Sequence, residues 1–197
     1  MDKILLLDCE TTGVKNHPIH GHPQVIELAY IDLTEIKLSS LTEAMVWTLP
    51  VVEQRFRPSM AIHPEAYKIH GISSRDLENC PKSETLTLPP IQYVLGHNIK
   101  YDKRCMNKKE IPEICTLDLA KTVSKNFNIK YDNHKLDTLV NHYYPDHAHK
   151  LVTPLHSASG DVVKNLLVLL KLVEHLRGIK TWDDLYDIQQ DIKKVRR

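Results

Sequence analysis

The chain has 197 residues and a formal net charge of +1, with 42% hydrophobic and 26% charged residues. These values are ordinary for a globular protein and allow one well-buried core. They exclude a uniformly basic protein that coats DNA, so any contact with nucleic acid must come from a local patch. No apolar run approaches the roughly 20 residues that a membrane-spanning helix needs, so we expect no membrane partner.

The cysteines and the N-terminus indicate a compartment. The chain has no CxxC spacing, which argues against a zinc knuckle or a redox pair. Its first residues lead straight into a short apolar run, without the pattern of a cleavable signal. We therefore expect a soluble protein in the reducing cytoplasm.

The first third of the chain is typical of a strand meander. Lys3–Asp8 is a short apolar run with a polar end, as in a central buried strand. Residues 13–23 hold two Gly, two Pro and three His, which predicts a loop. Residues 24–33 read as a second strand, and 45–56 as one or two more, interrupted near Pro50.

The remaining two thirds alternate helices with short strands, which predicts an α/β fold. The longest helix should run from Gly160 to Arg177, because apolar residues recur there at helical spacing. A last helix should start at Thr181, with Asp184 three residues later as in a capping box. Further helices are expected over 64–69, 74–79, 100–108, 117–125 and 135–144, and strands over 92–96 and 114–116.

Two carboxylates stand at the end of the first predicted strand. Asp8 and Glu10 are two residues apart, so their side chains leave the same face of the sheet and can both offer oxygen ligands to a hard cation. Alone, the pair also fits a solvated strand end. The turn over 11–13 that follows supplies hydroxyls and a glycine, and its backbone N–H groups can approach a phosphate or a terminal sugar.

Two further segments carry the same kind of chemistry. Asp102 follows a predicted strand near a helix start, where an acid is also favoured by the helix dipole. His156 and Asp161 open the longest helix, and five residues rise about 7.5 Å, so both can border one cleft if His156 precedes the first turn. Ser157 and Ser159 are alternative caps for that helix.

Together these residues predict a metal site. Carboxylates that converge on one cleft repel each other, and the usual reason to keep them is to hold divalent cations. A histidine beside such a site is a candidate general base. The combination favours metal-dependent phosphodiester hydrolysis.

The three segments, in this order, resemble the three motifs of the DEDDh 3′–5′ exonuclease superfamily. Asp8 and Glu10 match the first motif, Asp102 the second, and His156 with Asp161 the His-x-Ala-x-x-Asp third. Tyr101 replaces the usual phenylalanine, and residues 69–72 resemble an Ile-His-Gly-Ile element that helps hold the terminal nucleotide. The match covers about Lys3 to Arg177, and within the superfamily the chain most resembles the exonuclease X branch.

The resemblance implies a fold and a mechanism. The fold would be α/β, with a ribonuclease-H-like mixed sheet of about five strands flanked by helices. One exonuclease domain would span 1–197, with the catalytic fold over about 3–177 and a C-terminal helix over 181–194. Two Mg²⁺ or Mn²⁺ ions would lie ~3.5–4 Å apart. Asp8 would bridge both ions, Glu10 and Asp161 would complete one site, and Asp102 would serve the other. His156 would take a proton from the attacking water, and the product would be a nucleoside 5′-monophosphate.

The implied partner is nucleic acid with a free 3′ end, with single-stranded DNA favoured and DNA repair as a setting. An exoribonuclease acting on RNA or short oligonucleotides is an alternative, and so is a non-catalytic nucleic-acid-binding module. The intact set of four acids and a histidine argues against the module. The residues expected to hold substrate are Thr11, Thr12, Gly13, His70, Gly71, Ile72, Asn98 and Tyr101.

Three other groups of residues have two interpretations each. His17, His20 and His22 could bind a transition metal, but no acid or cysteine completes the set, so we expect their loop to border the substrate groove. Lys100, Lys103 and Arg104 place positive charge near Asp102, or form an ordinary solvated helix face. Tyr143, Tyr144 and Trp182 could stack on bases, although core packing is the preferred reading.

Overall fold

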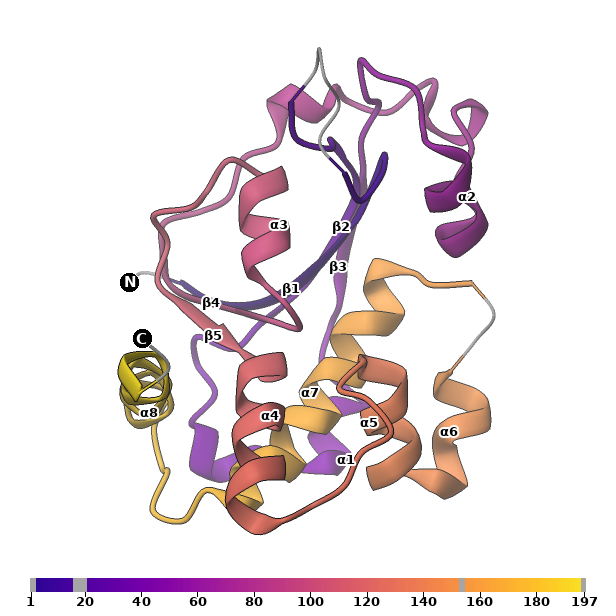
Figure 1. The fold of residues 1–197 in the computed structure, drawn as a ribbon. Coiled ribbons are helices and arrows are strands. Elements are labelled where there is room, and N and C mark those ends of the chain that lie inside the picture. The colour runs from indigo at the N-terminus through magenta and orange to yellow at the C-terminus, as the bar shows by residue number, and fades with distance from the viewer. Residues whose placement is uncertain (1–2, 16–20, 153–154, 196–197) are drawn as a thin grey trace.

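A mixed five-stranded sheet forms the centre of the molecule (Figure 1). The structure is a computed structural model that describes residues 3–15, 21–152 and 155–195. The strands lie in the order β3-β2-β1-β4-β5. The β1–β2 and β2–β3 pairs are antiparallel, whereas the β1–β4 and β4–β5 pairs are parallel. The predicted α/β fold and its ribonuclease-H-like sheet are confirmed. The strands are β1 Lys3–Thr11, β2 Val25–Asp32, β3 Val52–Arg55, β4 Ile91–Gly96 and β5 Glu113–Cys115.

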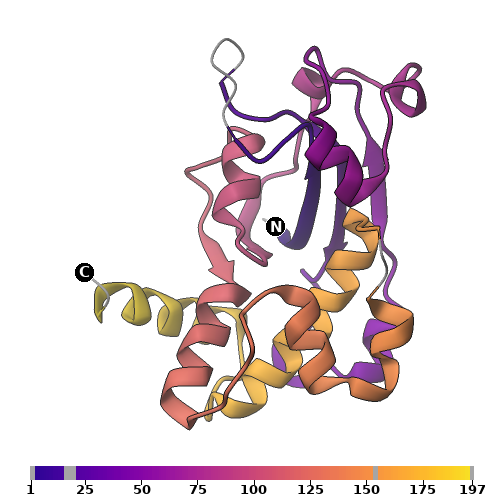
Figure 2. The same ribbon diagram turned by 45° about the vertical axis from the view of Figure 1, so that its right-hand side comes forward.

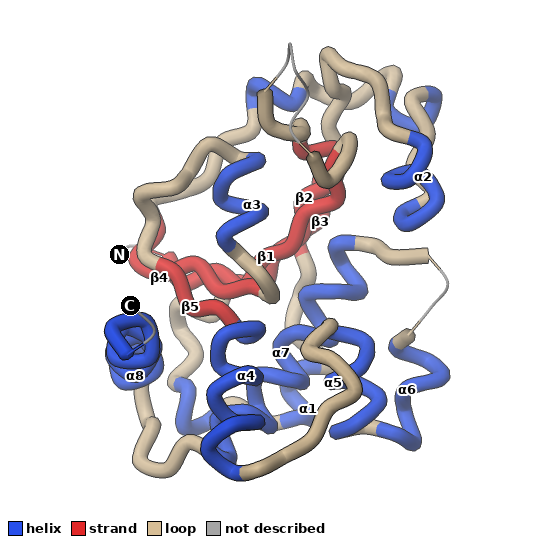
Figure 3. Tube along the Cα trace, in the orientation of Figure 1, coloured by secondary structure: helices blue, strands red, loops and turns tan. Residues whose placement is uncertain are grey.

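Helices cover both faces of this sheet, and Figure 3 shows most of them gathered below it, with α3 above. The helices are α1 Glu43–Val46, α2 Pro64–His70, α3 Lys100–Cys105, α4 Thr116–Phe127, α5 Leu136–Tyr143, α6 Pro145–Leu151, α7 Ala158–His175 and α8 Trp182–Val195. Neighbouring residues of β1 serve opposite faces, since Leu6 belongs to the core under α4, α5 and α7, and Leu7 to the core under α3. This alternation decides which way the acids of β1 point.

Several segments differ from the sequence-based expectation. The helix expected over 74–79 is only a 3-10 turn at Arg75–Leu77, and α3 ends at Cys105 instead of residue 108. Residues 45–56 were expected to be strand, but the segment opens with the helix α1, which Thr42 caps by accepting from the Met45 N–H at 3.4 Å. Only Val52–Arg55 pairs with the sheet, and all four residues are exposed. The helix α6 was not predicted; Pro145 occupies its first turn, where the missing N–H carries no penalty.

The C-terminal elements follow the predicted signals. The cap of α7 is Ser157, which accepts from the Gly160 N–H, so the helix begins at Ala158. Thr181 and Asp184 form a reciprocal capping box at α8, with bonds of 3.1 Å and 2.9 Å.

The aromatic residues Tyr144 and Trp182 are buried in the core, as preferred, while Tyr143 is half-buried against it. Trp182 also donates from Nε1 to the Ile36 carbonyl at 2.8 Å. His17 and His20 lie outside the described residues. Across the described ranges, no helix combines the length and apolar character that a bilayer crossing needs.

Candidate active site

The acidic residues of the three motifs meet at the C-terminal part of β1. Asp8 and Glu10 continue the row of Ile4 and Leu6 that faces α7, while Cys9 joins the core under α3. They share a face, as predicted. However, β1 runs on to Thr11, so both acids lie inside the strand rather than beyond its end.

The acids of the other two motifs lie close enough to Asp8 for their charges to shift its pKa. Burial, followed by the charges of Asp102, Asp161 and Glu10, holds the pKa of Asp8 well above its ordinary value. Asp102 comes from the first turn of α3 and Asp161 from the first turn of α7. The fold therefore brings together the four carboxylates that the sequence singles out.

Two of these carboxyl groups titrate near neutrality. Glu10 is 9% exposed, and burial, with a further contribution from the charge of Asp161, raises its pKa to about 7. Asp102 is 4% exposed, and burial raises its pKa to about 8, against the opposing effect of backbone N–H groups. Such groups ionise readily only when a cation compensates their charge.

The histidine of the third motif contacts one of the acids. His156 Nδ1 lies 3.1 Å from Asp161 Oδ2, and this hydrogen bond raises the pKa of the imidazole. Burial acts to raise the pKa of Asp161, but the hydrogen bond from His156 and the charge of Lys164 outweigh it, so the pKa is lowered. Glu10, His156 and Asp161 each offer a ligand atom within 4.8 Å of the others, a set that fits a divalent cation.

A buried lysine beside these residues was missed by the sequence analysis. The Nζ of Lys164 contacts Asp161 Oδ1 and lies 2.7 Å from Asp137 Oδ1. His156 Nε2 is 3.6 Å from Asp137 Oδ2, so Asp137 and Asp161 flank the imidazole. The available signal was the spacing: Lys164 follows Asp161 by three residues near the start of a helix rich in apolar residues, which puts both on one face.

Glu27 was also missed, although it is only 1% exposed. Its Oε1 accepts from the Ala158 N–H at 3.0 Å, and its Oε2 accepts from Arg55 Nε at 2.8 Å. Glu27 lies directly across from Glu10 in the β1–β2 pair. It ties the start of α7 to the sheet, and a lone acid within the apolar run 25–29 was the signal for it.

The turn after β1 is linked to α3 by the aromatic residue of the second motif. The Tyr101 hydroxyl lies 2.8 Å from Thr11 Oγ1 and donates to the Gly13 carbonyl, and Thr11 Oγ1 donates to the same carbonyl at 2.8 Å. Thr12 behaves differently from the expectation, because its N–H donates to the Gln24 carbonyl at 2.9 Å and is not open to a phosphate. Asn98 is exposed in the turn before α3, with φ at 63°.

Residues 69–72 lie next to His156, the candidate general base. The Ile69 carbonyl accepts from the His156 N–H at 2.9 Å. His70 and Ile72 are buried, and His70 Nδ1 accepts from the Ile72 N–H at 3.0 Å. Burial lowers the pKa of His70, partly offset by a backbone contact with Thr11. Gly71 ends α2 with φ at 70°, which favours glycine.

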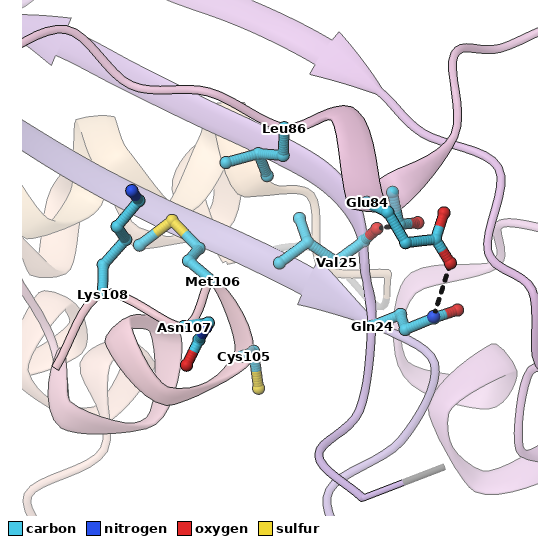
Figure 4. Close-up of a pocket in the computed structure, with 9 residues that line it drawn as sticks. Gln24, Val25, Glu84, Leu86, Cys105, Met106, Asn107 and Lys108 are labelled. Atoms are coloured by element: carbon cyan, nitrogen blue, oxygen red, sulfur yellow. Dashed lines mark hydrogen bonds between the residues drawn. The ribbon is translucent and has the colours of Figure 1, made fainter.

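A hollow of about 410 Å³ lies between the start of β2 and the end of α3 (Figure 4). Two of its polar side chains pair with each other, since Gln24 Nε2 donates to Glu84 Oε1 at 3.0 Å, and Gln24 Nε2 also donates to Ser59 Oγ at 2.8 Å. None of the four clustered acids lines it. A smaller hollow of about 230 Å³ is lined by Asp161 and Lys164.

With the geometry in place, comparison with known proteins decides the family. The family model described as Exonuclease matches residues 5–169. The chain belongs to the exonuclease family. The predicted resemblance to DEDDh exonucleases and the predicted enzyme class, a 3′–5′ exonuclease, are confirmed.

This exonuclease is similar to the DNA polymerase III subunit epsilon of Buchnera aphidicola subsp. Baizongia pistaciae, at 24% identity over 221 positions, which cover all of this chain and 79% of the relative. It is also similar to the solved structure of exonuclease X in complex with 5′-overhanging duplex DNA, with a TM-score of 0.64, 20% identity, and coverage of 94% of this chain and 98% of that one. The E. coli exonuclease I complex with a dA16 oligonucleotide gives a TM-score of 0.59 at 18% identity and covers 95% of this chain. The chain spans 43% of exonuclease I.

The donors in this exonuclease suit the divalent metals that the family generally uses. Carboxylate oxygens dominate the cluster, and hard oxygen ligands are those that Mg²⁺ and Mn²⁺ prefer. Both oxygens of Asp161 already have a partner in the protein, since His156 contacts one oxygen and Lys164 the other, and each oxygen keeps a second lone pair for a metal.

Proposed function

We propose that the chain is a metal-dependent 3′–5′ exonuclease that hydrolyses DNA to nucleoside 5′-monophosphates. The observation that carries the proposal is the shared burial of Asp8, Glu10, Asp102 and Asp161, whose charges act on one another. Burying four acids together is unfavourable unless cations join them.

Each acid has a proposed place. Asp8 would contact both of two Mg²⁺ or Mn²⁺ ions, Glu10 and Asp161 would hold one, and Asp102 the other. Such a pair supplies Lewis-acid stabilisation of the charge that builds on the phosphate and on the leaving 3′ oxygen. Glu27 would keep the third motif in position by holding the Ala158 N–H at the start of α7.

His156 is the proposed general base. If Nδ1–H donates to Asp161 Oδ2, the neutral ring keeps a lone pair at Nε2, and that atom would take the proton of the attacking water. The imidazolium that forms would have carboxylates on both sides, because Asp137 lies 3.6 Å from Nε2. A role as metal ligand is the alternative, since His156 shares a compact donor set with Glu10 and Asp161.

The terminal nucleotide would lie between two elements that flank the acids. Thr11, Gly13 and Tyr101 form one side, and the element over 69–72 forms the other, next to His156. Thr12 would help to shape the turn that borders the nucleotide, and Asn98 would face the bound strand. Figure 2 shows α2 and α3 apart on the two sides of this region, with the start of α7 below α2.

DNA is the proposed substrate because exonuclease X and exonuclease I were solved with DNA bound. We favour single-stranded DNA, in a repair setting, over RNA. We also propose that residues 1–197 form one exonuclease domain that works in the cytoplasm. Its four cysteines are free, as a reducing compartment requires.

The test is end-labelled digestion. The protein is incubated with Mg²⁺ on single-stranded DNA and RNA that carry the label at either the 5′ or the 3′ end. The proposal predicts that 5′-labelled DNA shortens one nucleotide at a time, that 3′-labelled DNA releases a labelled 5′-mononucleotide first, and that excess EDTA stops both. Faster RNA digestion would favour the exoribonuclease, and full activity in EDTA would contradict the proposal.

A further inference from the structure

A group of cations on and after α3 has no role in the chemistry described above. The helix contributes Lys100, Lys103 and Arg104, and the following turn contributes Lys108 and Lys109; we call these five residues the α3 basic surface. A hollow of about 190 Å³ is lined by four of them and by the single carboxylate Glu113. Since the whole chain carries only +1, this charge is a local concentration.

Backbone geometry builds this surface. The Asn107 N–H donates to the Arg104 carbonyl at 3.1 Å, and the Lys108 N–H donates to the Lys103 carbonyl at 2.7 Å. These two bonds, with Asn107 at φ 55°, form a Schellman motif that turns the chain back along the helix. The turn brings Lys109 to the hollow shared with Lys100 and Arg104.

Among the described residues, Glu113 is the only carboxylate that lines the hollow, and it neutralises one of the cations there. Lys103 is buried and pairs with Glu113 at 2.7 Å, so the charges of these two residues cancel at the hollow. Lys100 is 3.9 Å from the same carboxylate and its side chain is 58% exposed. Arg104 and Lys109 are exposed, and they share the hollow with one carboxylate, Glu113, which pairs with Lys103 and Lys100. These three cations are therefore available to an anionic partner.

The surface and the acid cluster share one short helix. Asp102 stands two residues from both Lys100 and Arg104, a rotation of about 200°, so the cations project from the side of α3 opposite to the acid. Lys108 extends the positive charge to the hollow that Gln24 and Val25 also line, where Figure 4 shows it beside Met106. A polyanion whose end reaches Asp102 can thus lie along cations on the outer side of the same helix.

We infer that the α3 basic surface binds the phosphodiester backbone of the nucleic acid beyond the terminal nucleotide. The inference rests on the proposed function, because it concerns the rest of the strand, or of its complement, whose 3′ end is cleaved. Lysine and arginine neutralise backbone phosphates without reading sequence, so the surface should raise affinity for long substrates independently of base composition.

The experiment compares short and long substrates. The test variant is Arg104→Glu/Lys109→Glu, with Arg104→Gln/Lys109→Gln as a milder form. The matched control is Lys125→Glu/Lys130→Glu, which makes the same charge change at exposed lysines around the end of α4. Thermal unfolding verifies that each variant is folded. The substrates are p-nitrophenyl thymidine 5′-monophosphate, a trinucleotide, a single-stranded 20-mer and a duplex with a 5′ overhang.

The inference predicts a length-dependent loss. For the test variant, KM for the 20-mer or the overhang duplex should rise about tenfold or more at low salt, with the ester and the trinucleotide within about twofold of wild type. The salt slope of log K for binding of the single-stranded 20-mer, measured by anisotropy in EDTA, should become shallower by about 1.4, the value for two lost phosphate contacts on a single strand. An effect confined to the duplex would assign the contact to the complementary strand, and one on both substrates to the cleaved strand.

Equal losses on short and long substrates would overturn the inference, and so would an unchanged salt slope for the 20-mer together with an unchanged KM for both long substrates. An equal effect of the control variant would do the same. If wild type hydrolyses no substrate, the proposed function fails, and the anisotropy measurement still decides whether this surface binds the 20-mer.

Discussion

Lys164 contacts Asp161, so an ammonium group of the protein already lies on a carboxylate that we propose as a metal ligand. The lysine side chain is 3% exposed and also pairs with Asp137. It therefore compensates part of the acid cluster before any metal binds.

Replacing this lysine should destabilise the metal-free protein. Lys164→Met leaves Asp161 and Asp137 without their cation, and breaking a buried ion pair from one side costs up to about 3–5 kcal/mol. Urea unfolding in EDTA measures the loss, and Mg²⁺ should recover part of it. Lys194→Met is the control, because Lys194 makes an exposed i,i+3 pair with Asp191 and its loss should change stability by about 1 kcal/mol or less. Equal effects of the two substitutions would show that Lys164 does not compensate the cluster.

Removing one acid should separate activity from stability. Asp8→Asn keeps the shape of the side chain and removes a group whose charged form is opposed by burial and by three neighbouring acids. We expect an inactive protein whose metal-free melting temperature equals or exceeds that of wild type. Added Mg²⁺ should raise the wild-type value and have much less effect on the variant. Asp191→Asn, at an exposed position, should behave as wild type. A clear drop in the metal-free melting temperature of Asp8→Asn would identify Asp8 as a structural hydrogen-bonding residue.

The catalytic histidine should affect turnover more than metal affinity. His156→Ala is expected to lower kcat by about 10²–10⁴-fold, the usual contribution of a positioned general base. Calorimetry with Mn²⁺ should show that the affinity largely survives. His149→Ala serves as the control at an exposed position in α6. If metal affinity collapses together with activity, His156 is a ligand, as its distances to Glu10 and Asp161 also allow.

The raised pKa values of Glu10 and Asp102 predict how stability depends on pH. In the unfolded chain these groups titrate near about 4, whereas in the fold they titrate at about 7 and about 8. Between these limits the folded state holds protons that the unfolded state has released. The contribution of these groups to the free energy of unfolding therefore falls as pH rises from about 4 to about 8.

Urea unfolding in EDTA across that range isolates this contribution. Wild type should lose stability relative to Glu10→Gln/Asp102→Asn as pH rises, because the variant lacks both titrating groups. The stabilisation of wild type by Mg²⁺ should grow over the same range, since metal and protons compete for the carboxylates. A difference between the proteins that is flat with pH would contradict the raised pKa values.

The sequence predicted most of the sheet because its strands carry local signals. The apolar runs over Lys3–Asp8 and over 24–33 identify both strands, and the two-residue spacing of Asp8 and Glu10 predicts that they share a face. The segment around Val46 was predicted wrongly, because its apolar residues fit either period and the Thr42 cap decides for a helix. The apolar residues of α6 do not recur at helical spacing, and only Pro145 marked the start of this helix.

The candidate site was predicted unevenly for a similar reason. Asp8, Glu10, Asp102 and Asp161 lie in recognisable motifs, and the structure brings them together. Glu27 and Asp137 act through partners that are distant in sequence: Glu27 and Ala158 are 131 positions apart, and Asp137 and Lys164 are 27 apart. Pairings at such separations depend on the tertiary fold, which local patterns do not encode.

The central claim is that the four carboxylates form one metal site. Anomalous diffraction from crystals grown with Mn²⁺ and thymidine 5′-monophosphate tests it most directly. The account predicts two peaks ~3.5–4 Å apart, one within ligand distance of Asp8, Glu10 and Asp161 and the other of Asp8 and Asp102. The absence of Mn²⁺ among these carboxylates, or its binding only elsewhere on the chain, would contradict the account.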